Sequence, residues 1–377
     1  MRILIVSHLA LPHVGGVENL VDLEIRGLAA VGHEVALVTS DGGGAGRTPA
    51  YPAVVRVIRV PAWHILERRL GIPYPLFGPG LLNPLIREIA RADIVHAHGF
   101  MFQNSALAVV VAKLLGKPCV LTDHGGIQRF ASKAATFAAR LGAETVGRLS
   151  ASLATRIVTY NARIQATLNK LGRRSDAEFV PNPVDGSLFY PPTAKERAAA
   201  RASLGWQADR KKVLFVGRLI AAKGVKLLLE AGDPSFDLVF CGPGDPSIIG
   251  AAPPGTELLA PRPQAELRQL YHAADTLALP AEVREGFPLV VQEAIACGLP
   301  AVLGDDPGFA PYRALPGLIL CERTPVAVRA AIQKALAVGA ALAESGQKPI
   351  EFFPTLERWV ARIFPMPDRR EASLVIA

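Results

Sequence analysis

The sequence is poor in several features that would define its class at once. It has only four cysteines, three tryptophans and 6% aromatic residues among 377 residues. No apolar run reaches the ~18 to 20 residues of a membrane-spanning helix. The start lacks the layout of a signal peptide, because its apolar run breaks at Ser7, His8 and Pro12. The expected location is therefore cytoplasmic.

The cysteines are too far apart for a metal or redox motif. Cys119, Cys241, Cys297 and Cys321 each lie inside an apolar run. We expect buried thiols in a reducing compartment.

The chain carries a net charge of +8, although no arginine-rich tail explains it. Its pI near 9.5 favours a partner with negative charge, such as nucleotide phosphate, anionic lipid or nucleic acid. Half the residues are hydrophobic, and the 34 glycines and 31 prolines are scattered between apolar runs. This composition predicts a globular protein with a packed core.

Short runs rich in Val, Ile and Leu alternate with helix-compatible segments, which is typical of a parallel sheet covered on both faces. Because one core rarely exceeds roughly 250 to 300 residues, we expect two doubly wound α/β domains. The first series of expected strands is Arg2–Val6, Glu34–Thr39, Val54–Val60, Asp93–His96, Pro118–Thr122, Arg156–Tyr160 and Glu178–Val180. The second series is Lys212–Val216, Asp237–Phe240, Thr256–Leu259, Thr276–Leu279, Pro300–Leu303 and Gly317–Leu320.

A proline-rich segment separates the two series. Residues 181–185 read PNPVD, and Pro191 and Pro192 precede a charged helix-forming run, so the boundary is predicted near residues 185 to 205. The expected domains are residues 1–190 and 200–350. In residues 351–377, aromatic and aliphatic side chains between Phe352 and Phe364 predict a helix that crosses back to the first domain. Residues 366–377 are expected to be a frayed tail.

A basic stretch in the first half has a periodic spacing. Its cations are Arg129, Lys133, Arg140, Arg148, Arg156 and Arg163, with Phe130, Phe137 and Leu141 between them. On helices this pattern could rest on anionic lipid, or it could be a solvated surface that Gly142 and Gly147 interrupt. Trp63 and the apolar residues 70–77 could extend the same surface or belong to the core.

Each half has a glycine-containing turn between its first strand and the next helix, where doubly wound domains bind phosphate. In the first half, Gly15 and Gly16 would let backbone N–H groups approach an anion, although a plain tight turn is the alternative. In the second half, Gly217 and Arg218 are followed by Lys223 and Gly224. Two cations so close to a strand end could hold a diphosphate.

Residues 282–298 form the most informative segment. Pro288 suits a helix start and Gly298 a helix stop, which predicts a helix from about 288 to 297. Glu285 then lies in the loop before this helix and Glu293 lies inside it. Such a helix start, flanked by two carboxylates, could bind a nucleotide sugar, or the two glutamates could be simple caps.

Six features in order resemble the retaining GT-B glycosyltransferases that include bacterial lipopolysaccharide hexosyltransferases and phosphatidylinositol mannosyltransferases. The matching features are Gly15-Gly16, the run DIVHAH at 93–98, the turn TDHG at 122–125, PNPVD at 181–185, the block from Gly217 to Gly224, and Glu285 with Glu293. The resemblance spans residues 1 to about 304. It implies two Rossmann-like domains that face each other across a cleft.

The resemblance also implies a role for each matching position. Arg218 and Lys223 would hold the donor diphosphate, and Gly217 belongs to the same turn. Glu293 would bind the ribose. Glu285 and the backbone of Gly286, Phe287 and Leu289 would bind the transferred sugar and the phosphates. Gly16, next to Gly15, would approach the diphosphate from the first domain, and His124 would lie near the sugar and the acceptor. The base would be bound near Gly242 and Arg262.

The implied activity is transfer of a hexose, with retained anomeric configuration, from a nucleoside-diphosphate sugar to a hydroxyl of a glycan or lipid-linked acceptor. Cations and helix N–H groups suit a leaving diphosphate. The sequence has no Asp-x-Asp motif, so we expect no metal. The resemblance implies no other cofactor and no nucleic-acid partner. His96 and His98 end a strand and could merely pack there. The segment after Asp305 is shorter than in the family, which leaves its donor-sugar contacts open.

Two other classes stay open. A nucleotide-sugar epimerase or hydrolase on the same fold would need no acceptor, and a non-catalytic homologue at the membrane would turn over no donor. Peripheral contact with the inner face of the cell membrane is an open alternative to a purely cytoplasmic location. The sequence does not define the oligomeric state.

Overall fold

The computed structural model describes residues 1–13, 15–42, 49–127, 132–250, 252–283, 286–345 and 349–364, with the side chains of Leu70 and residues 340–350 left aside. The chain divides into two compact units. Unit 1 comprises Met1–Asn182 and the segment that begins at Pro354, and unit 2 comprises Pro183–Phe353. Expected tail residues 366–377 lie outside the described residues.

The division at Asn182 falls earlier than the expected boundary near residues 185 to 205. Its physical reason is that the proline-rich segment packs on unit 2. The ring of Phe189 lies 5.9 Å from that of Tyr271, and the Tyr190 carbonyl lies 2.8 Å from His272 Nε2.

Unit 1 is built on a seven-stranded parallel sheet in the order β3-β2-β1-β6-β7-β8-β9. The strands are β1 Arg2–Val6, β2 Glu34–Ser40, β3 Val55–Val60, β6 Ile94–His98, β7 Cys119–Thr122, β8 Arg156–Thr159 and β9 Glu178–Phe179. Each lies within two residues of an expected strand. A hairpin of β4 Ala62–Trp63 and β5 Leu76–Phe77 was not predicted, because two residues are too few to show an alternating pattern.

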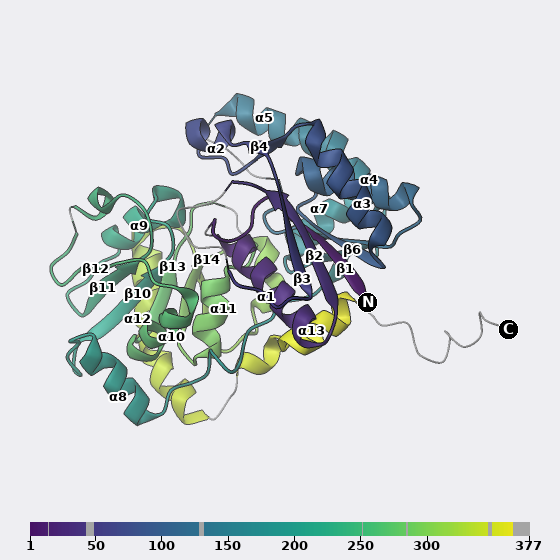
Figure 1. Cartoon of the computed structure of the whole chain (residues 1–377). Helices are drawn as coiled ribbons and strands as arrows, with labels where there is room; N and C mark the ends of the chain where they lie inside the picture. The colour runs from purple at the N-terminus through teal and green to yellow at the C-terminus, as the bar shows by residue number, and fades with distance from the viewer. Residues whose placement is uncertain are drawn as a thin grey trace. The chain divides into compact units, whose positions relative to one another are not determined.

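Helices cover both faces of this sheet (Figure 1). The helices of unit 1 are α1 Gly16–Ala30, α2 Ile65–Leu70, α3 Leu82–Arg91, α4 Gln103–Leu114, α5 Lys133–Gly142, α6 Arg148–Leu153, α7 Ala162–Gly172 and α13 Leu356–Ile363. Pro79–Leu81 forms a 3-10 turn. The last helix, α13, lies beside α1, and its Trp359 and Ile363 are buried with Val21 and Ile25 of α1. Thr355 caps its start by accepting from the Arg358 N–H at 3.3 Å.

Unit 2 has a six-stranded parallel sheet in the order β12-β11-β10-β13-β14-β15. The strands are β10 Lys211–Val216, β11 Phe236–Cys241, β12 Glu257–Leu259, β13 Thr276–Leu279, β14 Ala301–Gly304 and β15 Leu318–Cys321. The helices are α8 Ala194–Ser203, α9 Val225–Glu230, α10 Gln264–Ala273, α11 Leu289–Ala296 and α12 Pro325–Ser345. Shorter 3-10 turns are η3 Ala221–Lys223, Pro246–Ile249, Pro307–Tyr312 and Pro349–Phe352. All six expected strands are present.

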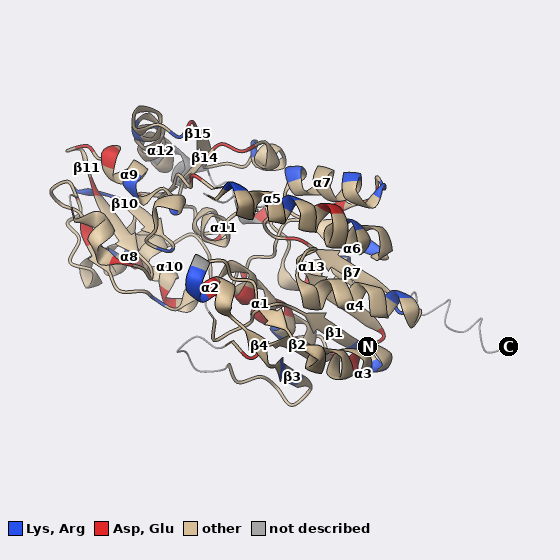
Figure 2. Cartoon of the chain, turned by 90° about the horizontal axis from the view of Figure 1, so that it is seen from above, with Lys and Arg blue, Asp and Glu red and all other residues tan. Residues whose placement is uncertain are grey.

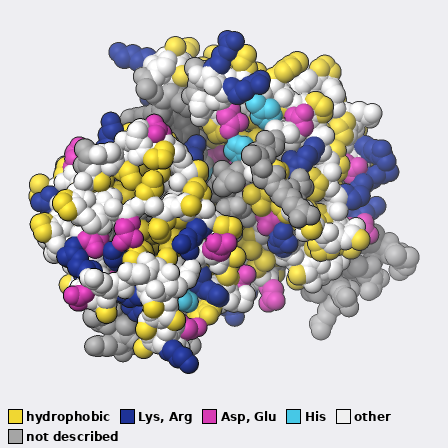
Figure 3. Space-filling view, turned by 60° about the vertical axis from the view of Figure 1, so that its left-hand side comes forward, with side chains coloured by type: hydrophobic (Ala, Val, Ile, Leu, Met, Phe, Trp, Pro, Cys, Tyr) yellow, Lys and Arg dark blue, Asp and Glu magenta, His cyan; other side chains and the backbone are white. Residues whose placement is uncertain are grey.

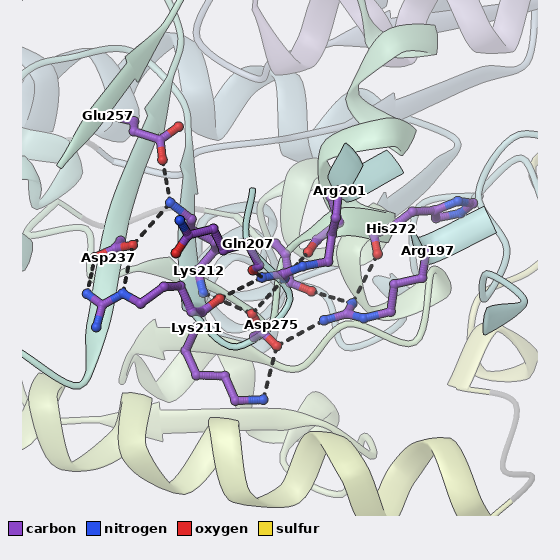
Figure 4. A network of polar contacts seen from close by, with 12 residues as sticks. Arg197, Arg201, Gln207, Lys211, Lys212, Asp237, Glu257, His272 and Asp275 are labelled. Carbon is purple, nitrogen blue, oxygen red and sulfur yellow. Dashed lines mark hydrogen bonds and ion pairs between the residues drawn. The ribbon is translucent and has the colours of Figure 1, made fainter. Parts of the chain in front are cut away.

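A charged network covers the edge of this sheet where the strands begin (Figure 4). Asp275, directly before β13, accepts from Arg197 at 2.9 Å and Arg201 at 3.2 Å, both on α8, and from the Lys212 N–H at 2.9 Å. Asp237 pairs with Lys212 at 3.1 Å. The charged run before residue 204 therefore anchors α8 to the sheet.

The basic stretch of unit 1 differs from the expectation. Gly142 and Gly147 do not interrupt the helix, because a π-helical segment, Ala143–Gly147, joins α5 to α6. Arg156 lies on strand β8 and pairs with Glu178 at 2.5 Å, so it is not on the same face. Arg129 and Phe130 lie outside the described residues. Within the described residues, no helix is both long and apolar enough to cross a bilayer.

The four cysteines are free. Cys119, Cys241 and Cys297 are buried and Cys321 is half-buried. Burial raises the pKa of Cys119 to about 12 and that of Cys321 to about 11, so these thiols are protonated at neutral pH. They fit the expected packing role.

Candidate active site

In each unit the carboxyl ends of the central strands meet at one edge of the sheet, where open parallel sheets bind ligands. In unit 1, β1 runs into the glycine turn, and Gly15 is the N-cap of α1. A Cβ at Gly15 would overlap the Glu18 carboxylate, so a side chain there would force this carboxylate to move. Gly16 is exposed, and a Cβ at this position would meet nothing within 4 Å. Only the first glycine thus has a close neighbour.

The buried carboxylate at the start of α1 belongs to a chain of ion pairs. Glu18 Oε1 lies 2.7 Å from His13 Nδ1, and Glu67 Oε1 lies 2.8 Å from His13 Nε2. The bond to Glu18 and that to Glu67 raise the pKa of His13 to about 9, against a cost of burial. Histidine side chains reach the surface with acidic ones nearby in Figure 3. The Gly15-Gly16 turn is therefore flanked by an imidazolium held between two carboxylates.

A buried histidine cluster lies beside this turn, at the ends of β6 and β7. His96 Nδ1 lies 2.6 Å from Glu24 Oε1, and His96 Nε2 lies 2.8 Å from Thr122 Oγ1. His98 Nε2 lies 3.0 Å from Glu24 Oε2. The side chains of Glu24, His96 and His98 are fully buried.

The predicted site residue His124 continues this cluster toward the surface. Its Nε2 lies 2.9 Å from His98 Nδ1, and its Nδ1 lies 3.0 Å from the Tyr160 hydroxyl. Burial and the neighbouring His98 hold the pKa of His124 well below its ordinary value. Burial opposes ionisation of Glu24, yet His96 and His98 outweigh it and lower its pKa to about 2. The cluster thus combines a buried carboxylate with a neutral imidazole that keeps partial exposure.

In unit 2, two glycine turns pack directly on each other at the ends of β10 and β11. The Gly217 N–H donates to the Cys241 carbonyl at 3.0 Å, and the Leu219 N–H donates to the Pro243 carbonyl at 2.8 Å. Gly242 has φ 154°, and a Cβ there would overlap the Gly217 carbonyl. Glycine is therefore required at position 242, and the structure brings Gly217 and Gly242 together.

The cationic turn also contacts the loop that leads toward α11. The Ala222 carbonyl accepts from the N–H groups of Glu282 at 3.0 Å and Val283 at 3.3 Å. Gly224 has φ 81°, and a Cβ there would strike the Pro280 carbonyl. Arg218 is exposed and Lys223 half-buried on this turn. The structure thus joins η3 to the loop after β13.

The helix α11 begins at Leu289 with Pro288 as its N-cap, one residue later than expected, and ends before Gly298, which has φ 72°. The ring of Phe287 is buried and stacks on Tyr312 at 3.7 Å. The first N–H groups of α11 have no carbonyl one turn earlier in the helix, so they can serve an anion.

The Glu293 side chain lies on the face of α11 that contacts α10. Its carboxylate accepts from Gln264 Nε2 at 2.7 Å and from the Tyr271 hydroxyl at 2.8 Å, both on α10. Burial raises its pKa, and these two hydrogen bonds oppose the rise. Only 5% of Glu293 is exposed, so a ribose would have to bind at this remaining edge or displace Gln264.

Arg262, predicted near the base, precedes α10 and donates to Gln269 Oε1 at 3.0 Å. It is close enough to Cys241 to oppose the rise in the pKa of that thiol that burial causes. Arg262 and Gly242 therefore both lie near the end of β11. Glu285 and its neighbour Arg284 lie outside the described residues.

Sequence reasoning missed Glu24 and Tyr160. Glu24 could have been found, because it shares the apolar face of α1 with Leu20, Val21 and Leu28, where an acidic side chain needs a buried partner. Tyr160 carries no such signal.

Two parallel α/β units with glycine turns at their carboxyl edges define the class as GT-B-like. Residues 14–188 match the model for Glycosyltransferase Family 4, and residues 196–338 match the model for Glycosyl transferases group 1. The chain belongs to this family of GT-B glycosyltransferases, as its sequence predicted.

One curated relative resembles this chain in sequence, and solved structures resemble it in fold. The chain is 31% identical over 253 residues to a D-inositol 3-phosphate glycosyltransferase of Segniliparus rotundus, a match that covers 60% of this chain and 54% of that protein. It therefore spans about half the length of this relative. Sucrose-phosphate synthase from Thermosynechococcus elongatus has a TM-score of 0.73 at 21% identity, with 100% of both chains covered. Anabaena HepE in complex with UDP-glucose has a TM-score of 0.65 at 18% identity, covering 96% of this chain and 94% of that one.

Proposed function

We propose that this protein transfers a hexose from a nucleoside-diphosphate sugar to a hydroxyl of a glycan or lipid-linked acceptor. The observation that carries the proposal is the contact of three backbone segments in unit 2. The Arg218–Lys223 turn, the turn at Gly242 and the loop after β13 are joined by hydrogen bonds at one edge of the sheet. Two cations and adjacent backbone amides suit a diphosphate. The UDP-glucose bound to HepE supports the same donor class.

The chemistry follows from charge. As the bond to the anomeric carbon breaks, negative charge grows on the leaving diphosphate, and Arg218 and Lys223 stabilise it there. We propose that the anomeric configuration is retained, with the leaving phosphate taking the acceptor proton. Because fixed cations can supply the stabilisation that a divalent ion would otherwise give, we also propose that no metal is needed. Glu285 and the amides of Gly286, Phe287 and Leu289 would hold the sugar and the phosphates, and Glu293 the ribose.

A donor screen tests the proposal. Nucleoside diphosphates and their hexose conjugates are added to the full chain, and a binder raises the melting temperature with the logarithm of its concentration. The donor found is then incubated with glycan and lipid acceptors, with and without EDTA, and products are analysed by mass and by NMR of the anomeric proton. Free sugar or an epimer without acceptor would instead mean a hydrolase or an epimerase. Absence of any donor binding would mean a non-catalytic homologue.

A second proposal concerns a membrane partner, and the exposed face of α5 and α6 favours it. Phe137 and Leu141 are 68% and 55% exposed, and Leu149 is 48% exposed. Lys133, Arg140 and Arg148 lie on the same two helices (Figure 2), although Arg148 pairs with Glu144. Apolar and cationic side chains together suit an anionic lipid surface. Trp63 is also exposed, whereas Phe77 is core.

Flotation with vesicles of phosphatidylglycerol and of phosphatidylcholine tests this partner. We expect binding to the anionic vesicles alone, and its loss in the double variant Arg140→Glu and Arg148→Glu. The matched control is Lys226→Glu with Lys334→Glu, which makes the same charge change at exposed positions of unit 2. Equal flotation of both double variants would contradict the proposal.

A further inference from the structure

In the buried histidine cluster of unit 1, the chemistry of the side chains determines which atom donates and which accepts in each contact. Each neutral imidazole has one nitrogen that donates and one that accepts. The side chains of Glu24, His98, His124 and Tyr160 form a line of close contacts at 3.0, 2.9 and 3.0 Å. The protonation of one end therefore determines every hydrogen position along the line.

Glu24 is the end of the line whose protonation is known. Its pKa of about 2 makes it a carboxylate at neutral pH, so it can only accept. Its Oε2 lies 3.0 Å from His98 Nε2, and neither atom has a well-aligned hydrogen-bond partner among the described residues. A lone pair on His98 Nε2 would repel the carboxylate at 3.0 Å, so this nitrogen carries the hydrogen.

The rest of the line follows. Burial and the nearby His96 lower the pKa of His98, so it is neutral, and its Nδ1 must accept. His124 then donates from Nε2, which leaves a lone pair on Nδ1 that faces the Tyr160 hydroxyl at 3.0 Å. The one hydrogen of this hydroxyl is shared between that lone pair and the His124 carbonyl at 3.3 Å. Thr122 bonds to His96, on a branch that does not reach His124.

We propose that Glu24 is a positioning residue that acts through His98 to hold the His124 imidazole in one tautomer, with hydrogen on Nε2 and a lone pair on Nδ1. The consequence for catalysis rests on the proposed function, in which His124 lies near the sugar. A fixed acceptor on His124 Nδ1 orients the Tyr160 hydroxyl, or a sugar hydroxyl that takes its place. This role resembles the carboxylate that orients an imidazole in hydrolytic triads.

A buried metal ion is the other reading of the cluster, since Glu24, His96 and His98 each offer a ligand atom. The observed separations of 2.6 and 3.0 Å between these carboxylate oxygens and imidazole nitrogens are hydrogen-bond lengths. Ligands in a tetrahedral zinc site with bonds of ~2.0 to 2.1 Å lie about 3.3 Å apart. The Glu24–His96 contact is a hydrogen bond, and both separations are shorter than those between zinc ligands, so the geometry favours direct contacts without an ion.

The test is long-range ¹H–¹⁵N NMR of the full chain with labelled histidine at pH 7, with the His124 signals assigned by their loss in His124→Gln. We expect a protonated Nε2 and an unprotonated Nδ1 on His124. In Glu24→Gln the amide can donate to His98 Nε2, so we expect the His98 and His124 tautomers to reverse or average. The matched control, Thr122→Val, removes a buried hydrogen bond from the other branch and should leave His124 unchanged.

The outcomes separate the inference from the proposed function. Hydrogen on His124 Nδ1 in the unaltered protein overturns the inference, and this measurement needs no variant to fold and no activity. Stoichiometric zinc binding that Glu24→Gln abolishes would also overturn it. Once a donor is known, Glu24→Gln should lower kcat about tenfold or more with little change in the donor KM. An unchanged kcat with reversed tautomers would overturn the positioning role.

Discussion

The two units differ in where their main polar clusters lie. In unit 1, Glu24, His96, His98 and Asp123 are buried where β1, β6 and β7 end. In unit 2 the largest charged network lies where β10, β11 and β13 begin, around Asp275 and Asp237 (Figure 4). Its opposite edge carries glycine turns and exposed or half-buried cations.

The difference lies in the type of group as well as its position. Seven of the eight histidines belong to unit 1, and His272 is the one in unit 2. Histidines can change charge near neutral pH, whereas arginine, lysine and paired carboxylates keep theirs. The charge of unit 1 therefore changes with pH, while the cations of unit 2 keep theirs, which suits the phosphate-binding role proposed for them.

The largest effect is expected at the fixed-charge network. Asp275→Ala removes the shared partner of Arg197 and Arg201 and leaves the mostly buried Arg201 without its carboxylate. Breaking a buried pair on one side costs about 3 to 5 kcal/mol. Urea unfolding should show this loss, and hydrogen exchange should locate it in unit 2. The surface pair of Asp305 and Arg313 gives the control, because Asp305→Ala should cost under about 1 kcal/mol.

The cations of unit 2 should come next. In the proposed function, Arg218 and Lys223 stabilise the leaving diphosphate, so we expect Arg218→Ala and Lys223→Ala each to lower kcat/KM about a hundredfold or more. Lys226→Ala changes an exposed lysine of α9, three residues further on, and should leave kcat/KM within about twofold of the unaltered protein. Steady-state kinetics with the donor from the screen decides this. Equal losses in all three variants would remove the diphosphate role.

As the pH falls, unit 1 should lose stability before unit 2. Burial lowers the pKa of His8 to about 4 and also lowers that of His98 and His124. Below pH 6.5 the unfolded chain binds protons that these folded histidines do not, so stability falls as the pH drops. Each contributes up to about 1.4 kcal/mol per pH unit.

Hydrogen exchange at pH 7 and pH 5 checks the location of this acid effect. Protection in β1, β6 and β7 should fall more than in β10 and β11. His8→Gln should reduce the pH dependence of this protection, because it removes one of the three histidines with a lowered pKa. Earlier loss of protection in unit 2 would refute the contrast between the units.

The fold could be predicted from the repeated βα pattern, because buried parallel strands are continuous apolar runs. The glycines at 217 and 224 could also be predicted, because they follow a strand and precede a helix. The line of contacts from Glu24 to Tyr160 could not be predicted. Glu24 and His98 are 74 residues apart and come into contact only because α1 packs against β6. Periodicity shows which face of a helix or strand is buried. Which side chain it contacts on another helix or strand depends on how the elements pack.

The smallest effect concerns the imidazolium beside the glycine turn. His13 has its pKa raised to about 9 by Glu18 and Glu67, against about 6.5 in an unfolded chain. Its ion pairs therefore stabilise the fold fully below pH 6.5, and this contribution is lost as the pH rises through 9. The melting temperature should fall between these values, and His13→Gln should flatten that fall. His33→Gln is the control: burial lowers the pKa of His33, so it titrates below this range. An unchanged slope in His13→Gln would mean that the imidazolium contributes nothing to holding the turn, and that Glu18 keeps its place at Gly15 by packing alone.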